Sequence, residues 1–137
     1  MARDTLQRGG RGREAQIQIA LAPCSPYSVT PEIMQASAEL ANQLDVRLHT
    51  HLAETLDEED FCLQRFGLRT VDYLDSVGWL GPRTWLAHGI HFNPDEIERL
   101  GAAGTGICHC PSSNMRLASG ICPTLDLLAA GAPIGLG

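Results

Sequence analysis

The sequence predicts an α/β fold in which parallel strands alternate with helices. Strand-like and helix-like segments alternate five and four times along the 137 residues, and no Asn-Gly hairpin signal interrupts them. Strands in this order are joined by right-handed crossovers. Histidines recur where the predicted strands end, which is the rim that carries catalytic residues in parallel βα folds.

The first predicted strand covers residues 16–22, where apolar and polar residues alternate up to a proline. A helix is predicted over residues 30–43, because Thr30 is a good N-cap and is followed by proline and glutamate. The second strand, residues 46–51, ends on His51. These three elements form the first βαβ unit of the prediction.

A longer helical connection is predicted over residues 57–77, as two helices broken near Gly67. Thr55 and Glu58 have the spacing of a capping box, which would begin the first of these helices. The third strand is predicted over residues 85–88, a short apolar run that ends on a histidine.

The last third of the chain repeats this alternation. Residues 93–101 begin with Asn-Pro-Asp-Glu and predict a capped helix. Residues 104–108 predict a short fourth strand that leads into His109. Residues 124–130 predict a helix capped by a glycine, and residues 133–137 predict the beginning of a fifth strand.

Composition excludes several classes of protein. All ten basic residues are arginine, and sixteen acidic residues give a net charge of −6, which argues against a nucleic-acid partner. No run of about eighteen apolar residues predicts a membrane span, and no signal peptide is recognisable, so we expect a cytoplasmic protein. Five cysteines without Cys-x-x-Cys spacing suit a reducing compartment. Nothing indicates the oligomeric state.

Four fragments carry a family resemblance. They are RLHTHLAET at residues 47–55, WLAHGIH at 85–91, CHCPSSNMRL at 108–117 and AGAPIGLG at 130–137. In this order they resemble the amidohydrolase superfamily, in the subgroup of aminohydrolases and chlorohydrolases, and the sequence looks most like 8-oxoguanine deaminases. The resemblance implies a (β/α)8 TIM-type barrel, of which about strands 4 to the start of 8 are present.

The resemblance also implies that the chain is an internal piece of a larger enzyme, because a complete barrel needs about 250 residues. The family's first-strand His-x-His motif would precede Ala20, and a ligand aspartate would follow Gly137. Residues 16–137 would form the partial barrel, and residues 1–15, with arginines among glycines, a flexible or aberrant lead-in.

Five residues receive roles from this resemblance. His51 would bind one divalent metal ion, with zinc preferred and iron as the alternative. Glu54 would carry a proton from the water to the leaving amino group, and His88 would hydrogen-bond the nucleophilic water or the developing oxyanion. For His109 and Asn114, direct substrate contact and hydrogen bonds that shape the loop around them are equally open interpretations.

Other polar residues are expected to be structural. His49 would fill the interior beneath the site, and His91 would be a loop residue. Cys108 and Cys110 flank a histidine, yet the His-x-Glu and Pro-Cys-x-x-Cys signature of cytidine-type zinc deaminases is absent. The sequence also lacks His-Glu-x-x-His and Gly-x-Ser-x-Gly motifs.

The predicted function is hydrolytic deamination of a small purine-like heterocycle, with 8-oxoguanine, giving urate and ammonia, as the preferred substrate. Alternatives are a guanine, S-adenosylhomocysteine or cytosine deaminase, a triazine chlorohydrolase, or a truncated product without catalytic activity. We expect the 137-residue chain to be inactive alone, because it lacks the other metal ligands of the family.

Overall fold

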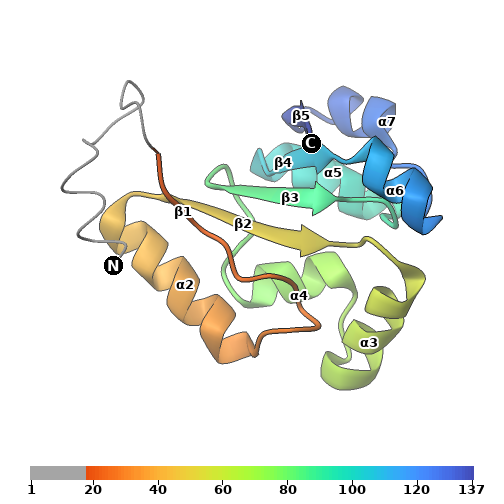
Figure 1. Ribbon diagram of the computed structural model, residues 1–137. Helices are drawn as coiled ribbons and strands as arrows, with labels where there is room; N and C mark the ends of the chain where they lie inside the picture. Colours follow the sequence, from red (N-terminus) through yellow and green to blue (C-terminus); the bar gives the residue numbers. More distant parts are fainter. Residues whose placement is uncertain (1–17) are drawn as a thin grey trace.

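The structure is a computed structural model that describes residues 18–137. The predicted lead-in and the first two residues of the predicted first strand lie outside the described residues. Five strands form one parallel sheet in the order β1-β2-β3-β4-β5 (Figure 1). They are β1 (Ala20–Leu21), β2 (Arg47–Leu52), β3 (Thr84–His88), β4 (Gly106–His109) and β5 (Ile134–Leu136).

Helices connect each strand to the next. They are α2 (Pro31–Leu44), α3 (Leu56–Phe66), α4 (Thr70–Ser76), α5 (Pro94–Ala103), α6 (Pro111–Leu117) and α7 (Thr124–Ala129). Consecutive parallel strands joined by helices are the repeating unit of a (β/α) barrel, and five strands in chain order form part of one. None of the helices within residues 18–137 has the length and apolar character needed to cross a membrane.

One predicted loop and one predicted helix end differ from the structure. The segment around Asn114, predicted as a loop, is the helix α6, which begins with proline at its first position. The helix predicted to end near Gly101 continues to Ala103, and Gly104 ends it in the left-handed conformation. A Cβ at Gly101, inside the helix, would clash with the carbonyl oxygen of Ala130, so only glycine permits this close approach of α5 to the end of α7.

Only one of the two hydrogen bonds of the capping box predicted before α3 is present. Thr55 accepts a hydrogen bond from the Glu58 N–H, as predicted. The Glu58 carboxylate, however, accepts from the N–H of Glu54, at 3.0 Å, and not from that of Thr55. A complete box, with Asn93 and Glu96, begins α5. Glu58 therefore holds the backbone at one of the predicted site residues.

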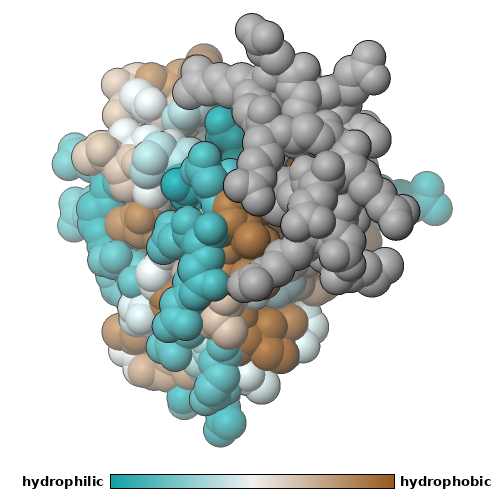
Figure 2. Space-filling view, turned by 90° about the vertical axis from the view of Figure 1, so that its left-hand side faces the viewer, coloured by the Kyte–Doolittle hydropathy of each residue, from teal (hydrophilic) through white to brown (hydrophobic). Residues whose placement is uncertain are grey.

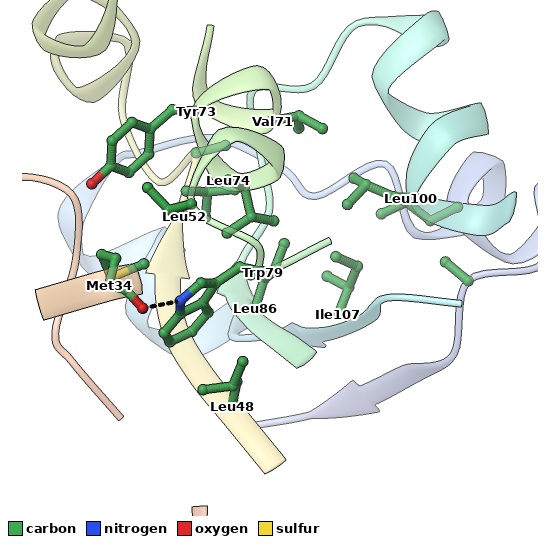
Figure 3. Packing of buried hydrophobic residues seen from close by; sticks show 14 of the residues in the cluster. Met34, Leu48, Leu52, Val71, Tyr73, Leu74, Trp79, Leu86, Leu100 and Ile107 are labelled. Carbon is green, nitrogen blue, oxygen red and sulfur yellow. Dashed lines mark hydrogen bonds between the residues drawn. The ribbon is translucent and has the colours of Figure 1, made fainter. Parts of the chain in front are cut away.

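The core lies between the sheet and the helices (Figure 3). Leu52 and Leu86 from neighbouring strands are fully buried with Trp79, whose indole N–H donates to the Met34 carbonyl at 2.8 Å. Full burial of a leucine side chain contributes roughly 1.5–3 kcal/mol to the stability of the fold. The core thus joins α2 to the strands that end at the site.

An ion network fixes the helices near the site. Arg69 pairs with Glu59 of α3 at 2.8 Å and makes two hydrogen bonds, of 2.8 and 2.9 Å, to Glu96 of α5. Both carboxylates are buried, so removal of the guanidinium would leave them without a counter-charge. The network connects α3, α4 and α5.

The carboxyl ends of the strands meet at one end of the sheet. The arrowheads of β2 and β3 point toward this end, where α3 and α6 lie (Figure 1). The described part of the side that carries α2 mixes hydrophilic and apolar residues (Figure 2). The predicted site residues lie at or just after the ends of these strands, close to α3 and α6.

Candidate active site

His51 lies near the end of β2, and its ring is held by the loop after β1. Its Nδ1 lies 2.6 Å from the Cys24 carbonyl oxygen, and its backbone N–H donates to the same oxygen at 3.0 Å. Because a carbonyl only accepts, Nδ1 is the donor, and in the neutral ring Nε2 keeps its lone pair. Within the described part of the chain Nε2 makes no hydrogen bond. A histidine oriented in this way is suited to bind a metal through Nε2.

Glu54 follows β2 by two residues, at the point where the chain turns into α3. Ala53 turns the chain with a positive φ of 52°. The Glu54 N–H is held by the carboxylate of Glu58, and its own side chain is 24% exposed. Glu54 therefore presents a carboxylate that is partly open to solvent on a fixed backbone.

His88 ends β3 and reaches the other two residues. Its φ is 72°, a left-handed conformation that is uncommon outside glycine and often found at functional sites. The next N–H, of Gly89, donates to the Leu52 carbonyl at 3.1 Å and holds this bend against β2. The buried His88 ring has Nε2 3.5 Å from Glu54 Oε1, and its centroid lies 5.4 Å from that of His51.

Asn114 of α6 is the second partner of His88. Its Oδ1 lies 2.8 Å from His88 Nδ1, and the residue is buried. Its Nδ2 is also buried and has no hydrogen-bond partner among residues 18–137. The same holds for Nδ1 of His109 at the end of β4. Buried polar atoms without a partner are uncommon, and a bound ligand is one way to satisfy them.

The structure thus brings together four of the five predicted residues. His51, Glu54 and His88 converge, with Asn114 behind His88. No hydrogen bond or ion pair joins His109 to them in the described part. Residues 18–137 also contain no group of three or more side chains placed to bind one metal ion. A catalytic zinc ion takes three protein ligands, so His51 needs further donors to hold one.

The two histidines expected to be structural have protein partners. Nδ1 of His49 lies 3.1 Å from the Trp85 carbonyl oxygen, and its ring stacks on the indole. Burial lowers the pKa of His49, which favours the neutral ring. Nε2 of His91 lies 2.9 Å from the Ser119 carbonyl oxygen. These contacts agree with structural roles.

Sequence reasoning missed the part that Glu58 plays at the site. The residue is 2% exposed, and burial raises the pKa of its carboxyl to about 7, although backbone N–H groups of Glu54 and Ala53 partly oppose this. Its spacing from Thr55 indicated only a cap. No local pattern shows that a first-turn glutamate is buried, so only the packing could reveal it.

A surface cavity lies away from these residues. It measures about 440 Å³ and lies between the loop after β1 and α3. Tyr27 and Phe61 form part of its wall, with ring centroids 4.8 Å apart. Neither His51 nor His88 lines it. The cavity is therefore distinct from the converging polar residues.

The family is shown by comparison with known sequences. The profile of the Amidohydrolase family matches residues 6–137. The chain belongs to this family. It is 87% identical over 127 residues to an 8-oxoguanine deaminase of Pseudomonas aeruginosa, covering 93% of this chain and 28% of the relative. It is 43% identical to a 5-methylthioadenosine/S-adenosylhomocysteine deaminase of Nitratidesulfovibrio vulgaris, covering 90% of this chain and 28% of the relative.

Solved structures of this family resemble the fold closely. An atrazine chlorohydrolase of Arthrobacter aurescens TC1, complexed with zinc, has a TM-score of 0.90 and 32% identity over 98% of this amidohydrolase chain and 30% of its own. An adenosine deaminase of Xanthomonas campestris with bound zinc has a TM-score of 0.87 and 33% identity, covering 91% and 29%. The predicted superfamily and the partial α/β barrel are confirmed. The chain spans less than a third of the length of these relatives.

Proposed function

We propose that this amidohydrolase chain forms part of a metal-dependent deaminase whose substrate is 8-oxoguanine. The observation that supports the reaction class is the convergence of His51, Glu54 and His88 at the carboxyl end of the sheet. The choice of substrate is supported by 87% identity to an 8-oxoguanine deaminase. The net charge of −6 is in keeping with a small-molecule substrate and no nucleic-acid partner, in a cytoplasmic enzyme.

In this proposal His51 is one ligand of a divalent metal ion, through Nε2. Zinc is the preferred ion, because zinc is bound in two related structures, and iron is the alternative. Such an ion lowers the pKa of its bound water to about 7, so that the water becomes nucleophilic near neutral pH. Residues 18–137 hold no group of three or more potential ligands, so the further ligands would come from other segments of the completed enzyme.

Glu54 would receive a proton from the water and pass it to the leaving amino group. Its partly exposed carboxylate can reach a substrate, and the hydrogen bond from its backbone N–H to Glu58 keeps it in place. Positioned general acid–base catalysis of this kind contributes typically 10²- to 10⁴-fold. His88, 3.5 Å from Glu54, would orient the water or stabilise the developing oxyanion.

Two further residues are proposed to bind the substrate. His109 has a buried Nδ1 and Asn114 a buried Nδ2, neither with a hydrogen-bond partner within residues 18–137. An oxidised purine offers ring nitrogens and carbonyl oxygens that could satisfy both. Pairing of such groups discriminates strongly between substrates, because a wrong ligand leaves them buried and unpaired.

The test uses a completed enzyme, in which the matching segment of the Pseudomonas aeruginosa deaminase is replaced by this chain. We expect ammonia and urate from 8-oxoguanine, with a kcat/KM at least about tenfold above that for guanine, S-adenosylhomocysteine, cytosine or a chlorotriazine. A higher kcat/KM for one of these would move the proposal to that substrate. A folded, zinc-loaded chimera without any turnover would favour the non-catalytic alternative.

A further inference from the structure

We propose that Asn114 is a positioning residue that fixes the proton of His88 on Nδ1 and thereby presents Nε2 as a hydrogen-bond acceptor beside Glu54. The catalytic consequence rests on the proposed function, whereas the state of the ring does not. The proposal also decides between the two roles left open for His88. An acceptor can orient a water molecule, but it cannot donate to an oxyanion.

The geometry assigns the proton. Asn114 Oδ1 lies 2.8 Å from His88 Nδ1, and an amide oxygen has only lone pairs, so the ring nitrogen is the donor. A neutral imidazole carries one proton, so Nε2 is left with a lone pair. Both residues are well shielded, at 6% exposed for His88 and 2% for Asn114, which strengthens the hydrogen bond between them.

Asn114 is itself held at both ends of its backbone. Its N–H donates to the Cys110 carbonyl at 2.9 Å, and its carbonyl accepts from the Ser119 N–H at 3.1 Å. The side chain therefore points from a fixed position in α6. On the other side of the ring, His88 is bent by its positive φ and stacks against His51. Asn114 is the only side chain in the described part that hydrogen-bonds the ring.

The tautomer matters because of what faces Nε2. With the proton on Nδ1, His88 Nε2 and Glu54 Oε1 are two acceptors, 3.5 Å apart, that do not bond to each other. Both remain available to the hydrogens of one water molecule, or Nε2 accepts from Glu54 once that group has taken a proton. The other tautomer would donate Nε2–H to the Glu54 carboxylate and occupy both groups.

The first test measures the ring directly. Chains labelled with ¹⁵N-histidine, alone and in the completed enzyme, are compared as parent, Asn114→Asp and Asn114→Leu, with the His88 resonances identified by their loss in His88→Gln. Asp keeps an acceptor oxygen and Leu has none. We expect the Nδ1–H form in the parent and Asn114→Asp, and loss of that preference in Asn114→Leu. The proposal would be overturned if His88 of the parent carried its proton on Nε2, or if Asn114→Leu kept the same His88 tautomer as the parent.

The second test separates positioning from substrate contact in the completed enzyme. Asn114→Leu should lower kcat by about 10- to 100-fold with zinc content unchanged, since a wrong tautomer no longer orients the water for attack. Both Asn114→Leu and Asn114→Asp lose Nδ2, so any rise in KM from lost substrate contact should be the same in the two variants. Asn114→Asp loses Nδ2 but keeps the acceptor, and it should recover most of kcat. Ser112→Ala, an exposed change in the same helix, is the control for folding.

The outcomes remain distinguishable. If Asn114→Asp keeps the Nδ1–H tautomer and is still as slow as Asn114→Leu, Asn114 acts through Nδ2 and the positioning role is wrong. If Asn114→Leu does not fold, the tautomer of the parent and the rate of Asn114→Asp still decide. If the parent has no deaminase activity, the proposed function fails, and the ¹⁵N measurement alone judges the inference.

Discussion

Replacing Glu58 with glutamine should change how the stability of the protein depends on pH. The carboxyl is buried, and one of its oxygens, Oε1, is buried without a hydrogen-bond partner in the described residues. Burial is the main reason that its pKa rises from 4.5 to about 7, and the charges of Glu54 and Glu59 add to the effect. Near neutral pH the folded state therefore retains a proton that the unfolded chain has lost.

The sign follows from this difference in protons bound. Because the folded state binds more protons between pH 4.5 and about 7, its stability falls as pH rises through this range. A change in pKa from 4.5 to about 7 corresponds to about 3 kcal/mol. Glu58→Gln removes the titration and keeps an acceptor for the Glu54 N–H. Its advantage in unfolding free energy over the parent should grow from under about 1 kcal/mol at pH 5 to about 3 kcal/mol at pH 8.

Urea denaturation of the completed enzyme at pH 5 and pH 8 measures this difference. Glu98→Gln, on the exposed face of α5, is the matched control and should show no such trend. Selective ¹³C labelling of glutamate carboxyls, with Glu58 identified by its loss in the variant, gives the pKa directly. An advantage that is the same at both pH values, or a Glu58 carboxyl that titrates near 4.5, would refute the reasoning.

Three further outcomes are expected. The 137-residue chain alone should release no ammonia from 8-oxoguanine, because the described residues hold no cluster of metal ligands; release that persists after removal of host enzymes would contradict this. In the completed enzyme, Glu54→Gln should lower turnover by about 10²-fold or more with zinc content unchanged; loss of zinc would make Glu54 a ligand, and Glu98→Gln is again the control. Gly101→Ala should lower the free energy of unfolding by about 1–3 kcal/mol, since the added Cβ would clash with the Ala130 carbonyl. Gly135→Ala is the control, because a Cβ there meets no atom within 4 Å, and it should leave stability unchanged. Equal thermal midpoints for the two variants would contradict the close packing at Gly101.

Local sequence patterns were sufficient for most of the fold. Apolar periodicity, caps and glycines act over a few residues, so the alternation of strands and helices and the strand-end positions of His51 and His88 could be predicted. The helix α6 was missed because Ser-Ser-Asn is a poor helix-forming sequence, and the hydrogen bond between Asn114 and His88 holds it in place instead. At α6, tertiary contacts determine the helix although the local sequence does not favour one.

The internal geometry of the site could not be predicted from the sequence. The contact between His88 and Asn114 joins residues 26 positions apart, and its direction depends on how β3 packs beside α6. The partner of His51 is a backbone oxygen, that of Cys24, which no side-chain motif marks. The raised pKa of Glu58 depends on burial that its first-turn position in α3 does not suggest. Each of these features arises from tertiary contact.

Metal content measured beside kinetics, in His51→Ala and His88→Ala of the completed enzyme, tests the central assignment most directly. Both residues are imidazoles near strand ends with rings 5.4 Å apart, and only their proposed roles differ. Loss of a direct ligand lets the ion dissociate, so His51→Ala should be depleted of zinc. His88→Ala should keep near-stoichiometric zinc and lose about 10²-fold or more in turnover. Equal depletion of zinc in both variants would place His88 among the ligands and contradict the site described above.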